Sequence, residues 1–300
     1  MKNNIAVIGL GSMGYGIATS CLRSGHLVWG VDTNIDQVKA FCSQGGQATT
    51  LNSVIDKIDV VVVVVLNSVQ TEEVLFGQEG LVENLKPGTV VISCATVAPT
   101  FAKDMEKRCK KFKVLYLDAP ISGGALKAKN GQLSIMASGV KEAFQHARPT
   151  LDSISETVFE LGDEAGTGSA MKSVNQLLAG VHIAVMAEAL TFGISQGISP
   201  DKFVEVISKC AGTSWMLENR APHIVNGDYK PHSSINIWPK DLGIVLDVAL
   251  ESKFNAPIAT AALEQFRTAV DMGLGFEDDA AVAKVYAKSA NLSLPKKNDV

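Results

Sequence analysis

The sequence has little cysteine, and its charge shows no positive excess. The five cysteines are scattered with no C-x-x-C pair, so we expect reduced thiols in a cytoplasm rather than a disulfide framework. The five histidines are dispersed as well, without metal-ligand spacing, so no metal site is expected. The net charge is -4. This charge indicates no basic patch of the kind that nucleic-acid-binding proteins have, and it does not favour binding to an anionic membrane surface.

Long hydrophobic runs are also missing. The longest one, residues 60–66, is far shorter than the roughly 20 residues that span a bilayer, so no membrane segment is expected. Its β-branched composition instead predicts a central parallel strand that is covered on both faces. No secretory leader is expected, because the apolar run of the first strand already begins at Ile5.

The first 160 residues alternate short β-branched runs with amphipathic segments, the pattern of a doubly wound α/β sheet. The expected strands cover residues 5–8, 27–31, 60–66, 90–92, 114–117, 133–137 and 158–161. The expected helices cover residues 13–23, 35–42, 71–76, 98–110 and 141–152.

The character of the chain changes after a glycine-rich loop at residues 162–168. Residues 169–193 contain no proline and are apolar on most faces, which predicts a buried helix, and no convincing strand follows. Since 300 residues exceed one ordinary core, we expect an α/β Rossmann domain over residues 1–163 and an all-α domain over residues 164–300. The apolar helical segments predict a homodimer or homotetramer.

A phosphate-binding loop is predicted between the first strand and the first helix. Gly9 permits a tight turn, Gly11 lets the backbone approach a pyrophosphate, and Gly14 lets the helix pack closely on the strand. The helix N-terminus then offers N–H groups to the phosphates. The predicted cofactor-binding residues of the loop are Gly9, Leu10, Gly11, Ser12, Met13 and Gly14.

Asp32 ends the second strand, where an acidic residue meets the ribose hydroxyls of a dinucleotide. Its carboxylate accepts from the 2′-hydroxyl and repels a 2′-phosphate. The residues that follow, Thr33 to Ile35, include no arginine or lysine. The sequence therefore predicts NAD rather than NADP, and the alternative is a glycine turn without a ligand.

Lys172 and Asn175 lie three residues apart on the apolar helix, so they share a face. A lysine is costly to bury without a partner or a function, and desolvation moves a buried lysine toward neutrality, which suits a general base. The alternative is a solvated lysine that extends to the surface. Upstream, Ser122, Gly123 and Gly124 form a neutral turn that could cradle a carboxylate, although glycine turns without ligands are common.

Four segments together resemble the β-hydroxyacid dehydrogenase family. They are the glycine loop at residues 9–14, Asp118-Ala-Pro-Ile-Ser-Gly-Gly124, the segment from Gly166 to Asn175 around Lys172, and Lys240-Asp241-Leu242. They occur in the family's order and extend over nearly the whole chain. The resemblance implies an NAD-dependent dehydrogenase of small hydroxy acids.

The resemblance also implies roles for individual residues. It makes Lys172 the base that removes the hydroxyl proton, with Asn175 hydrogen-bonded to the substrate and Ser122 to Gly124 holding its carboxylate. It places Thr96 beside the nicotinamide, Leu66 and Asn67 at the adenosine side, and Lys240 against both cofactor and substrate. For Asp241 we expect a helix cap, with orientation of the lysine as the alternative.

Within the family, the segments that begin at Asn175 and at Lys240 look most like L-threonate dehydrogenases. This implies oxidation of L-threonate to 2-oxo-tetronate; the alternatives are a 3-hydroxyisobutyrate or tartronate semialdehyde dehydrogenase and a non-catalytic NAD-binding protein. Imine-reducing relatives generally lack the lysine. Two positions depart from the common pattern: three residues separate Gly162 from Gly166 instead of two, and Gln176, a predicted substrate contact, stands where many members have a second asparagine.

Overall fold

The protein is described here from a computed structural model, over residues 2–47 and 51–297. It forms two compact units, Met1–Lys172 and Ser173–Val300. The division falls inside one long helix, α7 (Thr167–Ser195). Each unit has its own hydrophobic core, and each is described by itself below.

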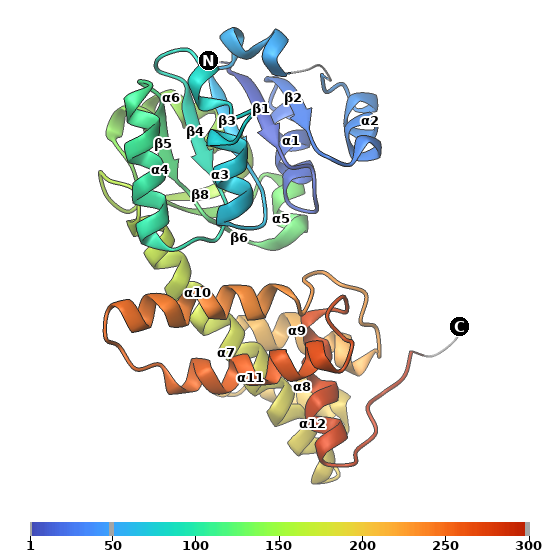
Figure 1. Ribbon diagram of the computed structural model, residues 1–300. Helices are drawn as coiled ribbons and strands as arrows, with labels where there is room; N and C mark the ends of the chain where they lie inside the picture. The colour runs from blue at the N-terminus through green and yellow to red at the C-terminus, as the bar shows by residue number, and fades with distance from the viewer. Residues whose placement is uncertain (1, 48–50, 298–300) are drawn as a thin grey trace. The chain divides into compact units, whose positions relative to one another are not determined.

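The first unit is built on a five-stranded parallel sheet in the order β2-β1-β3-β4-β5 (Figure 1). Its strands are β1 (Asn4–Ile8), β2 (Leu27–Val31), β3 (Val60–Val63), β4 (Val90–Ser93) and β5 (Leu115–Asp118). All five predicted strands of this sheet are confirmed. The third strand is shorter than predicted, because the chain leaves the sheet after Val63 and Leu66 is 67% exposed.

Helices cover both faces of this sheet, as the continuous apolar strands require. Alternate strand residues face opposite layers: Val60 and Val62 belong to one core cluster, and Val61 and Val63 to another. The first cluster includes residues of α1 (Gly14–Arg23), α2 (Ile35–Ser43), α5 (Gly124–Asn130) and α6 (Lys141–Ile154). The second includes residues of α3 (Ser68–Phe76) and α4 (Pro99–Lys111).

The strand order reverses between β1 and β3, because the chain runs from β1 to β2 on one side and returns to β3 on the other. In open α/β sheets, ligands bind at such a switch point, beyond the carboxyl ends of the strands. The loop of Gly9 to Gly14 follows β1, and Leu66 and Asn67 lie beyond β3. The predicted cofactor residues are therefore at the position that the topology favours.

A second, three-stranded sheet differs from the single doubly wound sheet expected. Its strands are β6 (Ile121–Ser122), β7 (Leu133–Ala137) and β8 (Ser155–Glu160), with β6 and β7 antiparallel. Neither β6 nor α5 was predicted, because two and seven residues are too short to show a period. A single bridge between Asp118 and Ser138 connects β5 to the turn after β7.

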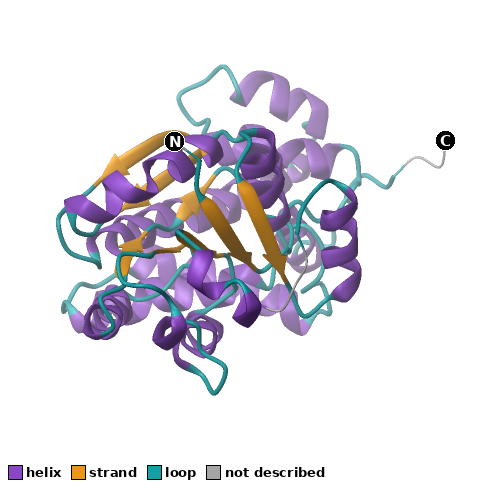
Figure 2. Cartoon of the chain, turned by 90° about the horizontal axis from the view of Figure 1, so that it is seen from above, coloured by secondary structure: helices purple, strands orange, loops and turns teal. Residues whose placement is uncertain are grey.

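The second unit is helical, as predicted; the strands, drawn in orange in Figure 2, lie within residues 4–160 of the described chain. The part of it that the structure describes contains one isolated bridge, Ser234 to Asp278. Beyond α7 its helices are α8 (Pro200–Ile207), α9 (Trp215–Val225), α10 (Ile237–Glu251), α11 (Pro257–Asp271) and α12 (Ala283–Ser289), with a short 3-10 turn at Asp279–Val282.

A buried polar cluster fastens the start of α10 in this unit. Asp279 accepts hydrogen bonds from Arg220 Nε at 2.6 Å and from the Trp238 indole at 3.0 Å. The Trp238 ring also stacks on Phe266 at 5.5 Å between centroids. Because a buried charge is stable only when it is paired and hydrogen-bonded, these contacts fix the segment from which Lys240 projects.

Helix α7 is long and apolar enough, by length and composition alone, to cross a membrane. Less than half of its most hydrophobic window, 44%, is buried inside the protein. Its buried residues, among them Ile183, Ala187 and Leu190, belong to the core of the helical unit. Core helices of globular proteins meet the same length and hydropathy criteria.

Candidate active site

The glycine loop after β1 has the geometry of a phosphate-binding turn. Gly9 has a φ of 93°, and a Cβ there would lie 2.3 Å from the Val64 carbonyl oxygen. A Cβ on Gly14 would lie 1.8 Å from the Gly9 carbonyl oxygen. Both glycines are therefore required by the protein's own packing.

Gly11 differs from its two neighbours in the motif. A Cβ there would meet nothing within 4 Å, and its φ is not in the left-handed region. The fold itself has no need of a glycine at this exposed position, whereas a pyrophosphate approaching the backbone does. Helix α1 also has no acidic residue in its first turn, so nothing there opposes a phosphate. The loop fits the pyrophosphate of a dinucleotide.

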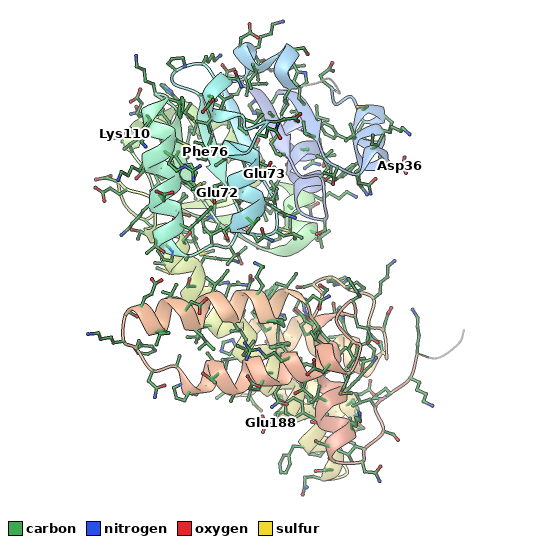
Figure 3. All side chains as sticks on the ribbon, in the orientation of Figure 1. Asp36, Glu72, Glu73, Phe76, Lys110 and Glu188 are labelled. Atoms are coloured by element: carbon green, nitrogen blue, oxygen red, sulfur yellow. The ribbon has the colours of Figure 1, made fainter. Side chains whose placement is uncertain are left out.

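Asp32 joins this loop to the end of β2. Its Oδ2 accepts from the Leu10 backbone N–H at 2.6 Å and its Oδ1 from the Asn34 N–H at 2.7 Å. Two backbone donors hold the half-buried carboxylate in one orientation, and each oxygen keeps lone pairs for a ribose hydroxyl. The next acidic residue, Asp36, lies on the exposed side of α2 (Figure 3).

The remaining predicted cofactor residues follow the neighbouring strands. Asn67 caps α3, with its side-chain oxygen accepting from Gln70 N at 2.9 Å, and the Gln70 side chain accepts from Leu66 N. This pairing differs from a capping box in that Gln70 accepts from Leu66, the residue before the cap, and Leu66 itself is exposed. Thr96 lies beyond β4 and is half-buried between the buried residues Ala95 and Val97.

The predicted base and the predicted carboxylate cradle come together in the first unit. Lys172 is buried, at 7% exposure, and its Nζ donates to the Ile121 carbonyl at 2.9 Å. The next residue is Ser122, and Gly123 and Gly124 follow with φ of 132° and 75°. The solvated alternative for Lys172 is therefore wrong: its amine lies beside the turn of Ser122.

Asp118 organises this arrangement, although no separate role is predicted for it from the sequence. It is 1% exposed, and its Oδ2 accepts from the backbone N–H groups of Gly166 at 2.9 Å and Ser169 at 2.8 Å. Its Oδ1 accepts from the Ser169 hydroxyl at 2.6 Å. The Ser138 hydroxyl accepts from the Gly168 N–H at 3.0 Å. Two side chains outside α7 thus satisfy the N–H groups of Gly168 and Ser169 in its first turn.

Burial raises the pKa of the Asp118 carboxyl, and the donors from Ser169 and Gly166 act in the opposite direction. A carboxylate at a helix N-terminus also interacts favourably with the helix dipole. Because Lys172 follows Ser169 by three residues, the anchor at Ser169 and the bond from Lys172 to Ile121 fix the same helical turn at two points. The geometry is that of an amine held in a fixed position beside a glycine turn.

The other predicted substrate residues form a chain of hydrogen bonds in the second unit. Asn175 Nδ2 donates to Gln176 Oε1 at 2.9 Å, and Gln176 Nε2 donates to Asp241 Oδ2. The ammonium of Lys240 pairs with Asp241 Oδ1. Gln176 and Asp241 are buried, whereas Asn175 and Lys240 are half-buried.

The expected capping role of Asp241 is wrong. Helix α10 begins at Ile237 after Asn236, so Asp241 lies in its second turn, beyond the reach of the free N–H groups. Its carboxylate instead orients Lys240 and accepts from Gln176, the alternative considered above. Gln176, expected as a substrate contact, uses both ends of its amide within the protein.

Comparisons with known proteins match both parts of the chain to families of dehydrogenases. Residues 4–162 match the family described as the NAD binding domain of 6-phosphogluconate dehydrogenase. Residues 166–286 match the family described as NAD-binding of NADP-dependent 3-hydroxyisobutyrate dehydrogenase. Together the two matches extend over most of the chain.

Individual relatives are similar over almost their whole lengths. An L-threonate dehydrogenase of Cupriavidus necator is 46% identical over 95% of this chain and 97% of its own, and one of Escherichia coli is 42% identical over 95% of each. A crystal structure of a 3-hydroxyisobutyrate dehydrogenase from Salmonella typhimurium superposes with a TM-score of 0.89 at 40% identity, covering 95% of this chain and all of the other.

The glycine loop with Asp32, the two-part architecture and these similarities agree on one assignment, and a non-catalytic NAD-binding protein is excluded because the relatives are dehydrogenases. The chain belongs to the β-hydroxyacid dehydrogenase family, the family of 3-hydroxyisobutyrate dehydrogenase, and is an NAD-dependent hydroxyacid dehydrogenase.

Proposed function

We propose that the enzyme oxidises L-threonate to 2-oxo-tetronate, with Lys172 as the general base. The observation that carries the role of Lys172 is its burial beside Ser122, with Nζ 2.9 Å from the Ile121 carbonyl oxygen. The choice of substrate is supported by the L-threonate dehydrogenases described above. A 3-hydroxyisobutyrate or tartronate semialdehyde dehydrogenase is the second candidate, supported by the similarity to the Salmonella typhimurium enzyme.

The oxidation removes a hydride from the substrate carbon and a proton from the hydroxyl group on that carbon. Bound NAD supplies the acceptor for the hydride. The hydroxyl proton goes to the neutral amine of Lys172, so that the carbon–oxygen bond becomes a carbonyl. The Ile121 carbonyl accepts one N–H of that amine, which holds the nitrogen beside the turn of Ser122. Ser122, Gly123 and Gly124 would hold the substrate carboxylate with a hydroxyl and backbone N–H groups.

Other predicted residues have supporting roles in this proposal. The loop of Gly9 to Gly14 and Asp32 bind the adenosine and pyrophosphate part of the cofactor, with Leu66 and Asn67 beside it. Thr96 lies by the nicotinamide. Asn175 and Lys240 contact the substrate, and Lys240 also reaches the cofactor.

The proposal is tested by following NADH production with purified enzyme and a set of hydroxy acids. The set contains L-threonate, D-erythronate, 3-hydroxyisobutyrate and D-glycerate, with their stereoisomers. We expect the highest kcat/KM for L-threonate. A higher kcat/KM for 3-hydroxyisobutyrate, or for D-glycerate, the reduced form of tartronate semialdehyde, would replace L-threonate by the second candidate.

We also propose that the chain forms a homodimer or homotetramer in a cytoplasm. Apolar side chains lie exposed along α7 at intervals of seven residues: Leu178 is 50% exposed, Val185 52% and Phe192 65%. This spacing follows one side of a helix, and such a stripe on a helix surface favours packing against another chain. The cytoplasm is supported by the five cysteines, all of them free thiols.

A further inference from the structure

The chain of hydrogen bonds from Asn175 to Lys240 lies between two closely packed helices. Gly180 follows Gln176 by one turn of α7, and a Cβ there would lie 3.0 Å from both Leu242 and Trp238 of α10. A glycine at this point lets the helices approach closely. The Gln176 side chain therefore reaches Asp241 between closely packed helices, and both side chains are buried.

The direction of each hydrogen bond in this chain is determined by chemistry. An ionised carboxylate only accepts hydrogen bonds, and Asp241 already pairs with the ammonium of Lys240. Gln176 must therefore turn its NH2 group toward Asp241, which leaves Oε1 to face Asn175. The side chain of Asn175 must in turn present its own NH2 group to that oxygen.

As a consequence the amide of Asn175 has one allowed orientation. A turned amide would bring Oδ1 against Gln176 Oε1, two acceptors without a proton between them. In the observed orientation Nδ2 faces Gln176, so Oδ1 is the end of the amide that points away from it. A half-buried carbonyl oxygen held in this way is prepared to accept a hydrogen bond from a ligand.

We propose that Asp241 and Gln176 are positioning residues that hold Asn175 Oδ1 ready to accept a hydrogen bond from a substrate hydroxyl other than the one oxidised. This inference rests on the proposed contact between Asn175 and the substrate, and it deepens the substrate class to hydroxy acids with at least two hydroxyl groups. The reacting hydroxyl gives its proton to Lys172, so a second hydroxyl is the donor that Asn175 selects.

Two variants separate this positioning role from an effect on Lys240. In Asp241→Asn the new amide can donate or accept a hydrogen bond. The amides of Gln176 and Asn175 are then no longer held in one orientation, and Lys240 loses its charged partner. In Gln176→Met the side chain keeps its approximate volume and Asp241 keeps Lys240, but Asn175 loses its acceptor. Asp247→Asn, on the same helix α10 and exposed, is the matched control.

The measurement is kcat/KM for L-threonate and for its 3-deoxy and 4-deoxy analogues, which retain the reacting hydroxyl. Wild type and Asp247→Asn are expected to prefer L-threonate over one of the analogues by about tenfold to a hundredfold. Asp241→Asn and Gln176→Met are both expected to lose about tenfold of that preference, while the preference over the other analogue is unchanged. The KM for NAD should stay the same in Gln176→Met.

Two results would overturn the inference. One is a Gln176→Met enzyme that keeps the wild-type preference over both analogues. The other is a loss in Asp241→Asn alone, which would mean that the effect passes through Lys240. Equilibrium binding of the three acids to the complex with NADH gives the same comparison without turnover. A wild type that prefers another hydroxy acid contradicts the proposed substrate only, and the series is then run with that acid and its deoxy analogues.

Discussion

The hydroxyl of Ser169 donates a hydrogen bond of 2.6 Å to Asp118, across 51 residues of sequence. The bond joins the first turn of α7 to the end of β5. A buried carboxylate that loses such a donor is costly, so Ser169→Ala should lower the free energy of unfolding by about 1.5–3 kcal/mol. Chemical denaturation measures this loss, and Ser195→Ala, at the exposed end of the same helix, should have almost no effect.

The cost of Ser169→Ala should also depend on pH. Burial raises the pKa of Asp118 and the Ser169 hydroxyl opposes that rise, so the variant raises the pKa further. When a carboxyl has a higher pKa in the folded than in the unfolded state, the free energy of unfolding falls as the pH rises through the folded-state pKa. The stability difference should therefore be smallest below about pH 4, the ordinary range of an aspartate, and grow as the pH rises. A difference that grows toward acid would contradict this account.

The sequence predicted the elements around this bond but not the bond itself. Asp118 stands in a quoted motif and Ser169 begins the predicted helix, yet nothing local shows that they meet. The side chain that caps a helix normally lies two or three residues before the N–H group that it accepts from. In α7 the N–H groups of the first turn are instead accepted by Asp118 and Ser138, which belong to other elements. Contacts at this separation follow from the sheet topology, which periodicity alone does not give.

Lys172→Ala should remove most of the turnover and leave cofactor binding intact. Without the amine no group in the proposed site accepts the hydroxyl proton, and loss of a general base costs about a hundredfold to ten-thousandfold in kcat. The measurements are kcat with L-threonate and NADH affinity by fluorescence titration. Lys209→Ala, at an exposed lysine, is the control. Near-normal turnover in Lys172→Ala would disprove the role of the lysine.

Asp32→Asn should weaken the preference for NAD over NADP. The wild-type carboxylate repels a 2′-phosphate, and the variant removes that charge, so the ratio of kcat/KM for the two cofactors should fall by about tenfold or more. Asp36→Asn, on the exposed side of α2 (Figure 3), is the control: it tests whether removing any nearby negative charge changes the cofactor preference. A wild type that prefers NADP would refute the role given to Asp32.

Gly11→Ala and Gly14→Ala should have opposite consequences. At Gly11 a Cβ meets nothing within 4 Å, so the variant should fold with an unchanged Tm and bind NADH more weakly. At Gly14 a Cβ would lie 1.8 Å from the Gly9 carbonyl oxygen, so the helix must shift, at a cost of about 1–3 kcal/mol. Thermal unfolding and NADH titration of both variants check this. Equal NADH affinity in wild type and Gly11→Ala would show that the pyrophosphate does not bind at this loop.

The exposed stripe on α7 should hold copies of the chain together. Sedimentation of the wild type should give a dimer or tetramer, and Val185→Glu, which places a charge in the stripe, should shift the population toward monomer. Val206→Glu, which places the same charge at an exposed valine of α8 outside the stripe, is the control. A wild type that sediments only as monomer would contradict the proposal.

The candidate site shows which features sequence reasoning reaches. Motif spacing predicts Gly11, Asp32, Ser122 and Lys172 as candidate site residues, since each lies near the end of a predicted strand or near the start of a predicted helix. It assigned Asp241 wrongly, because an aspartate near a helix start is usually a cap, and only the packing of α7 against α10 brings Gln176 to it. Tertiary contacts between helices, rather than local propensity, decided that assignment.

The anchor between Asp118 and Ser169 bears on how genes of this family can recombine. A crossover in the loop at residues 162–166 looks convenient, because it separates the two family matches. A chimera joined there must bring its own glycine and serine to the waiting carboxylate of Asp118, and its own lysine to the carbonyl of Ile121. Exchange of the helical half between relatives should therefore succeed when the donor carries these residues at the same positions, or when the first six residues of α7 come from the same parent as the sheet.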